Sequence, residues 1–193
     1  MAVADAPHKS ARPQLVLIAL VFFGPLLVAA WMYYGGHFGA AGSGSNHGAL
    51  LEPIVNLRAA AADSELLRQG EGRWMLLYAN DSYCADACRN ALYTLRQSRL
   101  MLGKEQDRLV RGFLHGDTPP DKVLLASEHQ GLIHMQDVEL AQLLNNKKPG
   151  ELATGGYFLV DPLGNLVMYF RPDIDPSDMV ADIKHLLRLS HIG

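Results

Sequence analysis

Cysteine is scarce in this chain, and several widespread functional motifs are absent from it. Only 2 of the 193 residues are cysteine, and two cysteines without a further spaced Cys or His pair do not make a structural zinc site. No GxxxxGKS, GxGxxG or HExxH pattern occurs, so nothing indicates a P-loop, a dinucleotide site or a zinc protease. The Cys-x-x-Cys-His motif that attaches c-type haem is also missing.

An excess of charge of one sign is lacking as well. The chain has 17 Lys and Arg against 20 Asp and Glu, for a formal net charge of −3, and its basic residues are spread among acidic ones. No nucleic-acid partner is therefore expected. Hydrophobic residues make up 49% and charged residues 19%, which fits one ordinary globular domain with an additional apolar segment.

Charge is missing altogether from a long N-terminal stretch. No Asp, Glu, Lys or Arg lies between Arg12 and Glu52, and Leu15–Tyr34 is apolar except for Gly24 and Pro25. As a helix this run would be about 30 Å long, the thickness of the hydrocarbon core of a bilayer. Its far end carries three aromatic residues typical of a membrane boundary: Trp31, Tyr33 and Tyr34. We therefore expect a single transmembrane helix.

The flanking charges predict its orientation. Lys9 and Arg12 precede the apolar run, and basic residues favour the cytoplasmic side. The N-terminus is then cytoplasmic and the C-terminal domain periplasmic, in a single-pass protein of a bacterial inner membrane. A cleaved signal peptide is the competing interpretation, with Val28-Ala29-Ala30 as a processing site, although its apolar core would be unusually long.

The predicted organisation has four parts. They are a cytoplasmic tail (1–13), a transmembrane helix (14–34), a Gly/Ser-rich linker (35–49) and a globular domain (50–193).

Within the domain, hydrophobic periodicity and turn residues predict alternating strands and helices. The expected order is a short helix (63–69), a strand (73–79), a long helix (85–102), a strand (108–115), a helix (138–145), two strands joined by a turn (157–160 and 165–170) and a last helix that starts at Asp175-Pro176. This order is that of a thioredoxin-like α/β domain, with two parallel strands joined by a crossover helix, an antiparallel hairpin and a closing helix.

The two cysteines lie where the first of these strands leads into the long helix. Cys84 and Cys88 are four residues apart, and the free N–H groups and positive dipole of a helix N-terminus favour a reactive thiolate. The carboxylates of Asp81 and Asp86 oppose this effect, and Arg89 offsets them. A permanent disulfide is the alternative, but closing so small a ring contributes only about 2 kcal/mol. We therefore predict that Cys84 and Cys88 are catalytic.

These features resemble the Sco (SenC) proteins. The resemblance rests on the Cys84-x-x-x-Cys88 pair after a strand, on a second strand leading into Gly116-Asp117-Thr118-Pro119, and on the run Tyr157–Gly164. Sco proteins are membrane-anchored, thioredoxin-fold factors that deliver copper to the dinuclear copper site of cytochrome c oxidase or reduce its cysteines. The resemblance implies a role in oxidase assembly, with Cu(I) as the candidate metal and no cofactor assigned with certainty.

One departure from that family concerns the metal. Sco proteins have a histidine that completes the copper site, and Ala153 occupies the corresponding position here. Cys84 and Cys88 can still hold Cu(I), which accepts two soft sulfur ligands. His115, at the end of the second strand, is the tentative third ligand. His129, His134 and Met135 are further candidates, although surface or packing roles are the ordinary explanation for each of them.

The sequence thus predicts a membrane-anchored thioredoxin-like factor for cytochrome c oxidase assembly. It would act by thiol–disulfide exchange, by transient Cu(I) handling, or by both, and oxidase subunits or other assembly factors would be its partners. Enzymatic turnover as a thiol–disulfide oxidoreductase is left open. The alternative function is a non-catalytic membrane-tethered adaptor whose cysteines form a structural disulfide.

Overall fold

The computed structural model describes residues 12–34, 46–149, 155–190 and 192. The chain divides into two compact units, Met1–Gly44 and Ser45–Gly193, which are described separately. Much of the predicted tail and linker, together with Ala153, lies outside the described residues.

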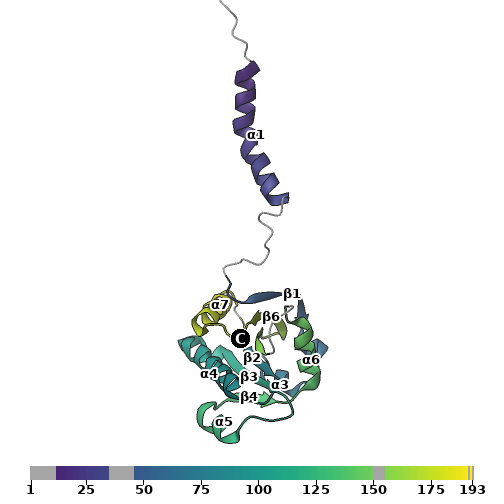
Figure 1. Ribbon diagram of the computed structural model, residues 1–193, viewed down its shortest axis with the longest axis vertical. Helices are drawn as coiled ribbons and strands as arrows, with labels where there is room; N and C mark the ends of the chain where they lie inside the picture. Colours follow the sequence, from purple (N-terminus) through teal and green to yellow (C-terminus); the bar gives the residue numbers. More distant parts are fainter. Residues whose placement is uncertain (1–11, 35–45, 150–154, 191, 193) are drawn as a thin grey trace, which may run out of the picture. The chain divides into compact units, whose positions relative to one another are not determined.

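In the first unit the described residues form helix α1 (Arg12–Tyr34), which continues through Pro25 (Figure 1). Its described side chains are almost all exposed, and large apolar residues lie all round the helix from Val16 to Trp31. Within the described residues, no helix combines the length and the hydropathy that a membrane span requires.

The second unit is built on a six-stranded mixed sheet in the order β1-β6-β5-β2-β3-β4. Its elements are β1 (Ala49–Asn56), α2 (Leu57–Ala60), α3 (Glu65–Gln69), β2 (Trp74–Asn80), α4 (Asp86–Met101), the 3₁₀ helix η1 (Gly103–Arg108), β3 (Leu109–His115), α5 (Lys122–Glu128), β4 (Leu132–Met135), α6 (Val138–Lys147), β5 (Gly156–Val160), β6 (Asn165–Phe170) and α7 (Pro176–Leu189).

Parallel pairing joins β2 to β3 and β3 to β4, whereas β5 pairs antiparallel with β2 and with β6. This arrangement confirms the predicted thioredoxin-like topology. Two strands were not predicted: β1, which pairs antiparallel with β6 at one edge, and β4, which forms the other edge. The short helix α5, which includes the apolar residues 123–125, was not predicted either.

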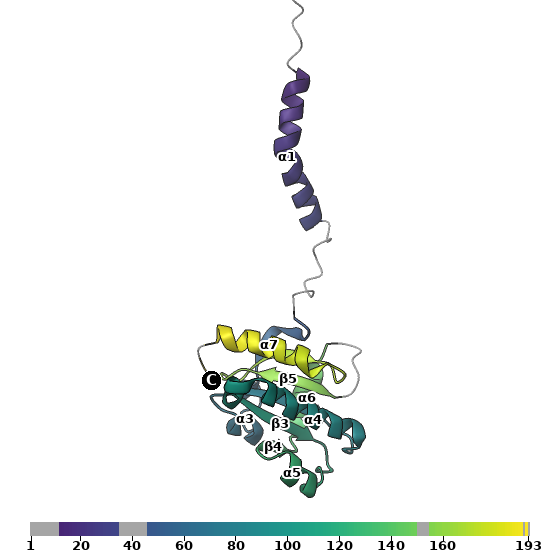
Figure 2. The same cartoon turned by 90° about the vertical axis from the view of Figure 1, so that its left-hand side faces the viewer.

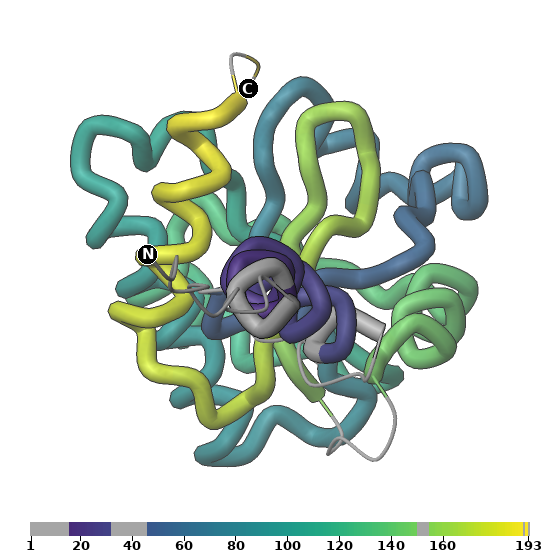
Figure 3. Tube along the Cα trace, turned by 90° about the horizontal axis from the view of Figure 1, so that it is seen from above, coloured from purple at the N-terminus to yellow at the C-terminus, as the bar shows by residue number. Residues whose placement is uncertain are grey.

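Helices cover both faces of the sheet, because the strands alternate two sets of apolar side chains. One face packs against α4 and α7, and the opposite face packs against α3 and α6 (Figures 1 and 3). Helix α4 buries the stripe that its periodicity predicts: Cys88, Ala91, Leu92 and Leu95. In α7 the corresponding buried residues are Met179, Val180, Ile183 and Leu187.

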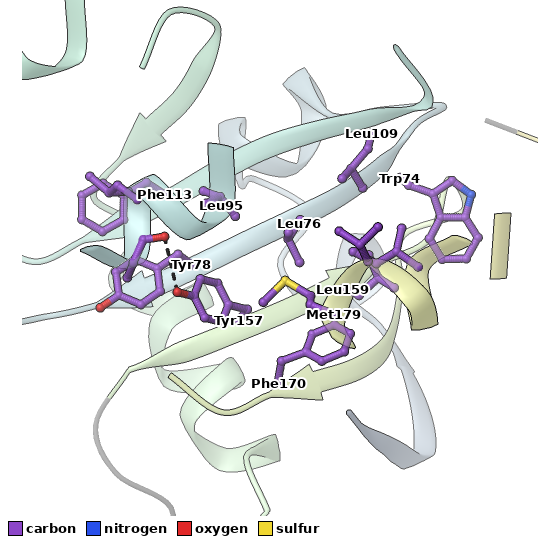
Figure 4. Close-up of a cluster of buried hydrophobic side chains, with 14 of the residues drawn as sticks. Trp74, Leu76, Tyr78, Leu95, Leu109, Phe113, Tyr157, Leu159, Phe170 and Met179 are labelled. Carbon is purple, nitrogen blue, oxygen red and sulfur yellow. Dashed lines mark hydrogen bonds between the residues drawn. The ribbon is translucent and has the colours of Figure 1, made fainter. Parts of the chain in front are cut away.

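The core on the α4 and α7 face is rich in aromatic rings at one end. Tyr78 stacks on Phe113 with ring centroids 5.6 Å apart, and Tyr157 lies 5.3 Å from Tyr78. Trp74 and Leu109 lie at the other end of the same cluster (Figure 4). The two cysteines belong to this core, so the fold places them against buried apolar side chains.

Candidate functional site

A short loop joins the central strand β2 to helix α4 and carries the first cysteine. Asn80 closes the end of the strand, because its side-chain oxygen accepts a hydrogen bond from the Ser82 N–H at 3.2 Å. The Ala85 N–H donates to the Tyr83 carbonyl at 2.9 Å, and Ala85 then caps α4. This local turn chemistry places Cys84 immediately before the helix and Cys88 in its first turn.

Cys84 and Cys88 form a disulfide, with their Cα atoms 4.9 Å apart. The bond is largely covered, but unequally: Cys84 is 8% exposed and Cys88 is 2% exposed. Beside them, Tyr83 is 69% exposed on the surface. Of the two residues, Cys84 is therefore the less deeply buried.

The helix end next to Cys84 offers free hydrogen-bond donors. Ala85 makes no side-chain capping bond, so the first N–H groups of α4 receive no oxygen from a cap residue. These groups and the helix dipole stabilise negative charge on a nearby sulfur. Asp86 lies in the same first turn, and its carboxylate competes with a thiolate for this positive end of the helix.

Two buried tyrosines contribute to the core beneath the pair. Burial raises the pKa of Tyr157, and the nearby Tyr78 adds to the effect, although a hydrogen bond with Thr94 opposes it. Burial also raises the pKa of Tyr78. The Tyr157 hydroxyl donates to the Ala91 carbonyl of α4 at 3.3 Å. Both rings thus remain neutral and supply a rigid apolar support rather than a charge.

The start of β5 departs from the usual thioredoxin arrangement. Thioredoxins present a cis-proline before this strand, whereas Gly155 and Gly156 stand here with φ of +85° and +141°. The Tyr169 hydroxyl donates to the Gly155 carbonyl at 3.1 Å. A Cβ on Gly156 would collide with the Tyr169 ring, so a glycine is required at this position.

His115 ends β3, as predicted. Its ring lies 5.8 Å from that of Phe113 and 5.8 Å from that of His134, and its Nδ1 is 2.8 Å from the Gly116 carbonyl oxygen. Burial lowers the pKa of His134, and the neighbouring His115 adds to this. His129 lies elsewhere, buried next to arginines.

No group of three or more His, Cys, Asp or Glu side chains arranged to hold a metal occurs among the described residues. Two thiolates are available to a soft ion only after reduction, because in the disulfide the sulfurs are bonded to each other. The assignment of Cys84, Cys88 and His115 as Cu(I) ligands therefore stays a prediction for the reduced protein.

A cavity of about 420 Å³ opens at the carboxyl ends of β2 and β3 and beside the start of α6. Its polar lining includes several residues that the sequence did not single out: Asn80, Gln136, Asp137, Gln142 and Asn145. The Gln136 amide donates to the Asp117 carboxylate at 2.7 Å within this lining. The signal that could have found it is topological, since clefts of α/β sheets form at the carboxyl ends of parallel strands.

Comparison with known proteins gives the same fold. A family model described as "Transmembrane-like, thioredoxin-like, C-terminal domain" matches residues 74–190, and one described as "Transmembrane-like, N-terminal domain" matches residues 9–36. No curated protein sequence matches the chain.

Solved structures of Sco proteins are similar to this one. Yeast Sco1 is 19% identical with a TM-score of 0.50, over 64% of this chain and 88% of the yeast chain. ScoI of Arabidopsis thaliana, with copper bound, is 17% identical with a TM-score of 0.50, over 64% of this chain and 89% of that chain. The resemblance to Sco proteins is thus confirmed in the fold, and identities this low establish the fold alone.

Proposed function

This chain belongs to the family of transmembrane-like, thioredoxin-like C-terminal domains, and we propose that it is a membrane-anchored factor that assists cytochrome c oxidase assembly through Cys84 and Cys88. The observation that carries the proposal is the placement of this pair. A disulfide joins the β2–α4 loop to the first turn of α4, and its less buried residue, Cys84, directly precedes a helix N-terminus without a side-chain cap.

This geometry supports thiol–disulfide exchange as the proposed activity. In the reduced domain the Cys84 thiolate attacks a partner disulfide, one partner sulfur leaves as a thiolate, and a mixed disulfide forms. Cys88 then loses its proton to solvent and attacks the Cys84 sulfur, which releases the second partner thiolate. Two electrons pass to the partner, and the Cys84–Cys88 disulfide is restored. A thiol donor must reduce it again before the next cycle.

Transient Cu(I) handling uses the same two sulfurs. Two thiolates one helical turn apart can hold a soft monovalent ion in two-coordination, and His115 is the proposed third donor. Oxidase subunits with cysteine-based copper sites, or other assembly factors, are the proposed partners for either activity.

The N-terminal unit is proposed to anchor the chain, with its C-terminal domain in the periplasm of a bacterial inner membrane. The family model over residues 9–36 and the apolar side chains all round α1 support this, since a helix that is apolar on every side needs an apolar environment. We expect the full chain to resist alkaline carbonate extraction from membranes and a variant lacking residues 9–36 to be extracted. Release of the full chain would refute the anchor. A phosphatase fused after Gly193 would be active only if that end is periplasmic.

A non-catalytic adaptor is the second candidate, and the low exposure of the pair favours it. At 8% and 2% exposure, the disulfide packs in the core as a structural crosslink would. Under this alternative the cysteines only stabilise the domain, and the partner binds elsewhere on its surface.

Serine substitutions at each cysteine separate these candidates. In cells that express the full chain, Cys88→Ser should accumulate a thiol-sensitive adduct with its partner, because the resolving sulfur is gone, whereas Cys84→Ser should not. Cells that express either variant should lose cytochrome c oxidase activity, while the level of the folded variant equals that of the unmodified chain. If the double variant supports full oxidase activity, the adaptor is correct and thiol chemistry is excluded.

Copper handling has its own test. The reduced full chain in uncharged detergent is titrated with Cu(I) against a chromogenic chelator, alongside Cys84→Ser and His115→Gln. We expect submicromolar binding that Cys84→Ser abolishes and His115→Gln weakens. Equal binding by Cys84→Ser and the unmodified chain would remove the copper role and leave thiol exchange standing.

A further inference from the structure

Three arginine side chains line a second cavity in the domain. Neither the segment before β5 nor the N-terminal unit contributes to its lining. Arg96 and Arg99 project from α4 and Arg111 from β3, and the cavity between them has a volume of about 280 Å³. The remaining lining comes from Leu100 of α4, from Ser127 and Glu128 at the end of α5, and from Gln130, which follows α5. Helix α4, strand β3 and helix α5 lie next to one another in Figure 2. We call this cavity the arginine pocket.

Arg111 is the deepest of the three. It lies in the middle of β3, paired with Leu76 and Leu132 of the neighbouring strands, and is 5% exposed. Its Nη2 donates to the Gln130 carbonyl at 2.6 Å, but its Nη1 is buried and has no hydrogen-bond partner. A buried guanidinium with an unused donor is costly unless an anion or another acceptor completes it.

Arg96 and Arg99 are held mainly by backbone oxygens. Arg96 donates to the Glu128 carbonyl at 2.8 Å, and its buried Nε has no partner. Arg99 donates to the Leu109 carbonyl at 2.8 Å and pairs with Asp107 at 3.2 Å. The Asp107 side chain is 88% exposed, so this ion pair is largely screened by water.

Positive charge in the pocket is therefore poorly compensated. Its one acidic lining residue is Glu128, which is exposed. Burial lowers the pKa of Arg111, and the charges of Arg99 and Arg96 lower it further. Burial also lowers the pKa of the adjacent His129, and Arg111 and Arg96 again contribute. The carbonyl contacts hold the guanidinium groups in place in spite of this mutual repulsion.

We propose that the arginine pocket binds a phosphate group. Three planar guanidinium groups are best complemented by a ligand with several acceptor oxygens and more than one negative charge. A phosphate group has both properties, whereas a single carboxylate does not. The group is either free inorganic phosphate or the phosphate of an anionic lipid. A purely structural role would use the carbonyl contacts alone and would leave the Arg111 Nη1 and Arg96 Nε without a function.

Calorimetric titration of the full chain in uncharged detergent tests this directly. Inorganic phosphate is one titrant, and short-chain phosphatidylglycerol, with phosphatidylcholine as its control, is the other. We expect saturable binding of one of the two anions at an ionic strength where chloride gives none. Phosphate binding identifies a soluble ligand, and phosphatidylglycerol binding without phosphate binding identifies a lipid.

Variants locate the site. Arg99→Gln and Arg96→Gln change half-buried side chains and should each weaken binding about tenfold or more, since each removes a charge-assisted contact. Arg171→Gln is the matched control, because Arg171 is 63% exposed outside the pocket, and it should bind within about twofold of the unmodified chain. Arg111→Met should abolish binding, and its thermal melt shows whether it is folded.

Two results would overturn the proposal: no saturable binding of either anion beyond chloride, or equal weakening by Arg171→Gln and Arg99→Gln. Neither result bears on thiol chemistry, which is read out at Cys84 and Cys88.

Discussion

At the residue scale, the charge nearest the reactive sulfur sets how readily it ionises. Asp86 occupies the first turn of α4, next to Cys84, and its carboxylate opposes a thiolate there. We expect Asp86→Asn to lower the pKa of the reduced Cys84 thiol and to speed its alkylation near neutral pH by roughly two- to fivefold. The measurement is the rate of iodoacetamide modification as a function of pH.

A matched control is available at a distance. Asp63 is exposed in the loop before α3, so Asp63→Asn makes the same change of charge away from the cysteines. If both variants alter the alkylation rate equally, the effect comes from net charge and the local interaction has no role.

The glycine at the start of β5 supports a second prediction. Gly156 has a φ of +141°, and an added Cβ would meet the Tyr169 ring, whereas Gly72 has a φ of +76° with no heavy atom within 4 Å of that position. Gly72→Ala should cost about 1 kcal/mol from backbone strain alone. Gly156→Ala adds a steric clash and should cost about 2–4 kcal/mol. Thermal melts compare the two variants. Equal losses of stability would mean that the Tyr169 ring can move away from the added Cβ at no cost in free energy.

At the scale of elements, one carboxylate fastens the start of the domain to its last helix. Asp182 of α7 is 5% exposed, and its Oδ2 accepts hydrogen bonds from the His47 and Gly48 N–H groups, each at 2.8 Å. Asp182→Ala leaves both donors without an acceptor and should lower the free energy of unfolding by about 2 kcal/mol. Urea denaturation followed by tryptophan fluorescence measures this loss.

Asp178 provides the comparison on the same helix. It contacts the His47 ring at 3.6 Å and is about half exposed, so Asp178→Ala should cost less than about 0.5 kcal/mol. A loss as large as that of Asp182→Ala would show that the buried hydrogen bonds contribute no more than a surface contact.

Elements with strong periodicity could be predicted from the sequence, and the edges of the sheet could not. Helices α4 and α7 carry apolar stripes at helical spacing, and the β5–β6 hairpin is marked by its Asp161–Gly164 turn. Strand β4 has only four residues, and β1 has a mixed burial pattern interrupted by Pro53. Such strands depend on pairing with distant partners, which local patterns do not encode.

The candidate site was predictable where its residues are close in sequence. Cys84 and Cys88 are joined by one turn of chain, so the step from strand to helix was enough to place them together. The arginine pocket draws on α4, β3, the end of α5 and Gln130, and its unused donors result from tertiary packing. Only the fold brings Arg111 next to Arg96 and Arg99.

At the scale of the whole molecule, buried histidine makes stability depend on pH. Burial, together with Arg111 and Arg96, lowers the pKa of His129 below its ordinary value of 6.5. The unfolded chain then takes up the proton more readily than the folded one. The contribution of neutral His129 to the free energy of unfolding is therefore fully present above about pH 6.5 and is lost as the pH falls below it. Denaturation at several pH values between roughly 5 and 6.5 should show this decline.

His129→Gln should flatten that decline without abolishing it, because the pKa of His134 is lowered as well. Glu65 and Asp175, whose pKa values are lowered by hydrogen bonds, lose their contributions only at more acidic pH, below their ordinary values of 4.5 and 3.8. An unchanged slope in His129→Gln would place the titrating group elsewhere.

The attachment of His47 and Gly48 to Asp182 also has a mechanical consequence. A pull on the chain that precedes residue 46 would reach these two hydrogen bonds before it reached the β1–β6 ladder. Helix α7 would bear the first load and shield the edge strand from being peeled away. A pulling force on the N-terminal side of the domain would then strain the attachment to α7 while the strands of the sheet stay paired.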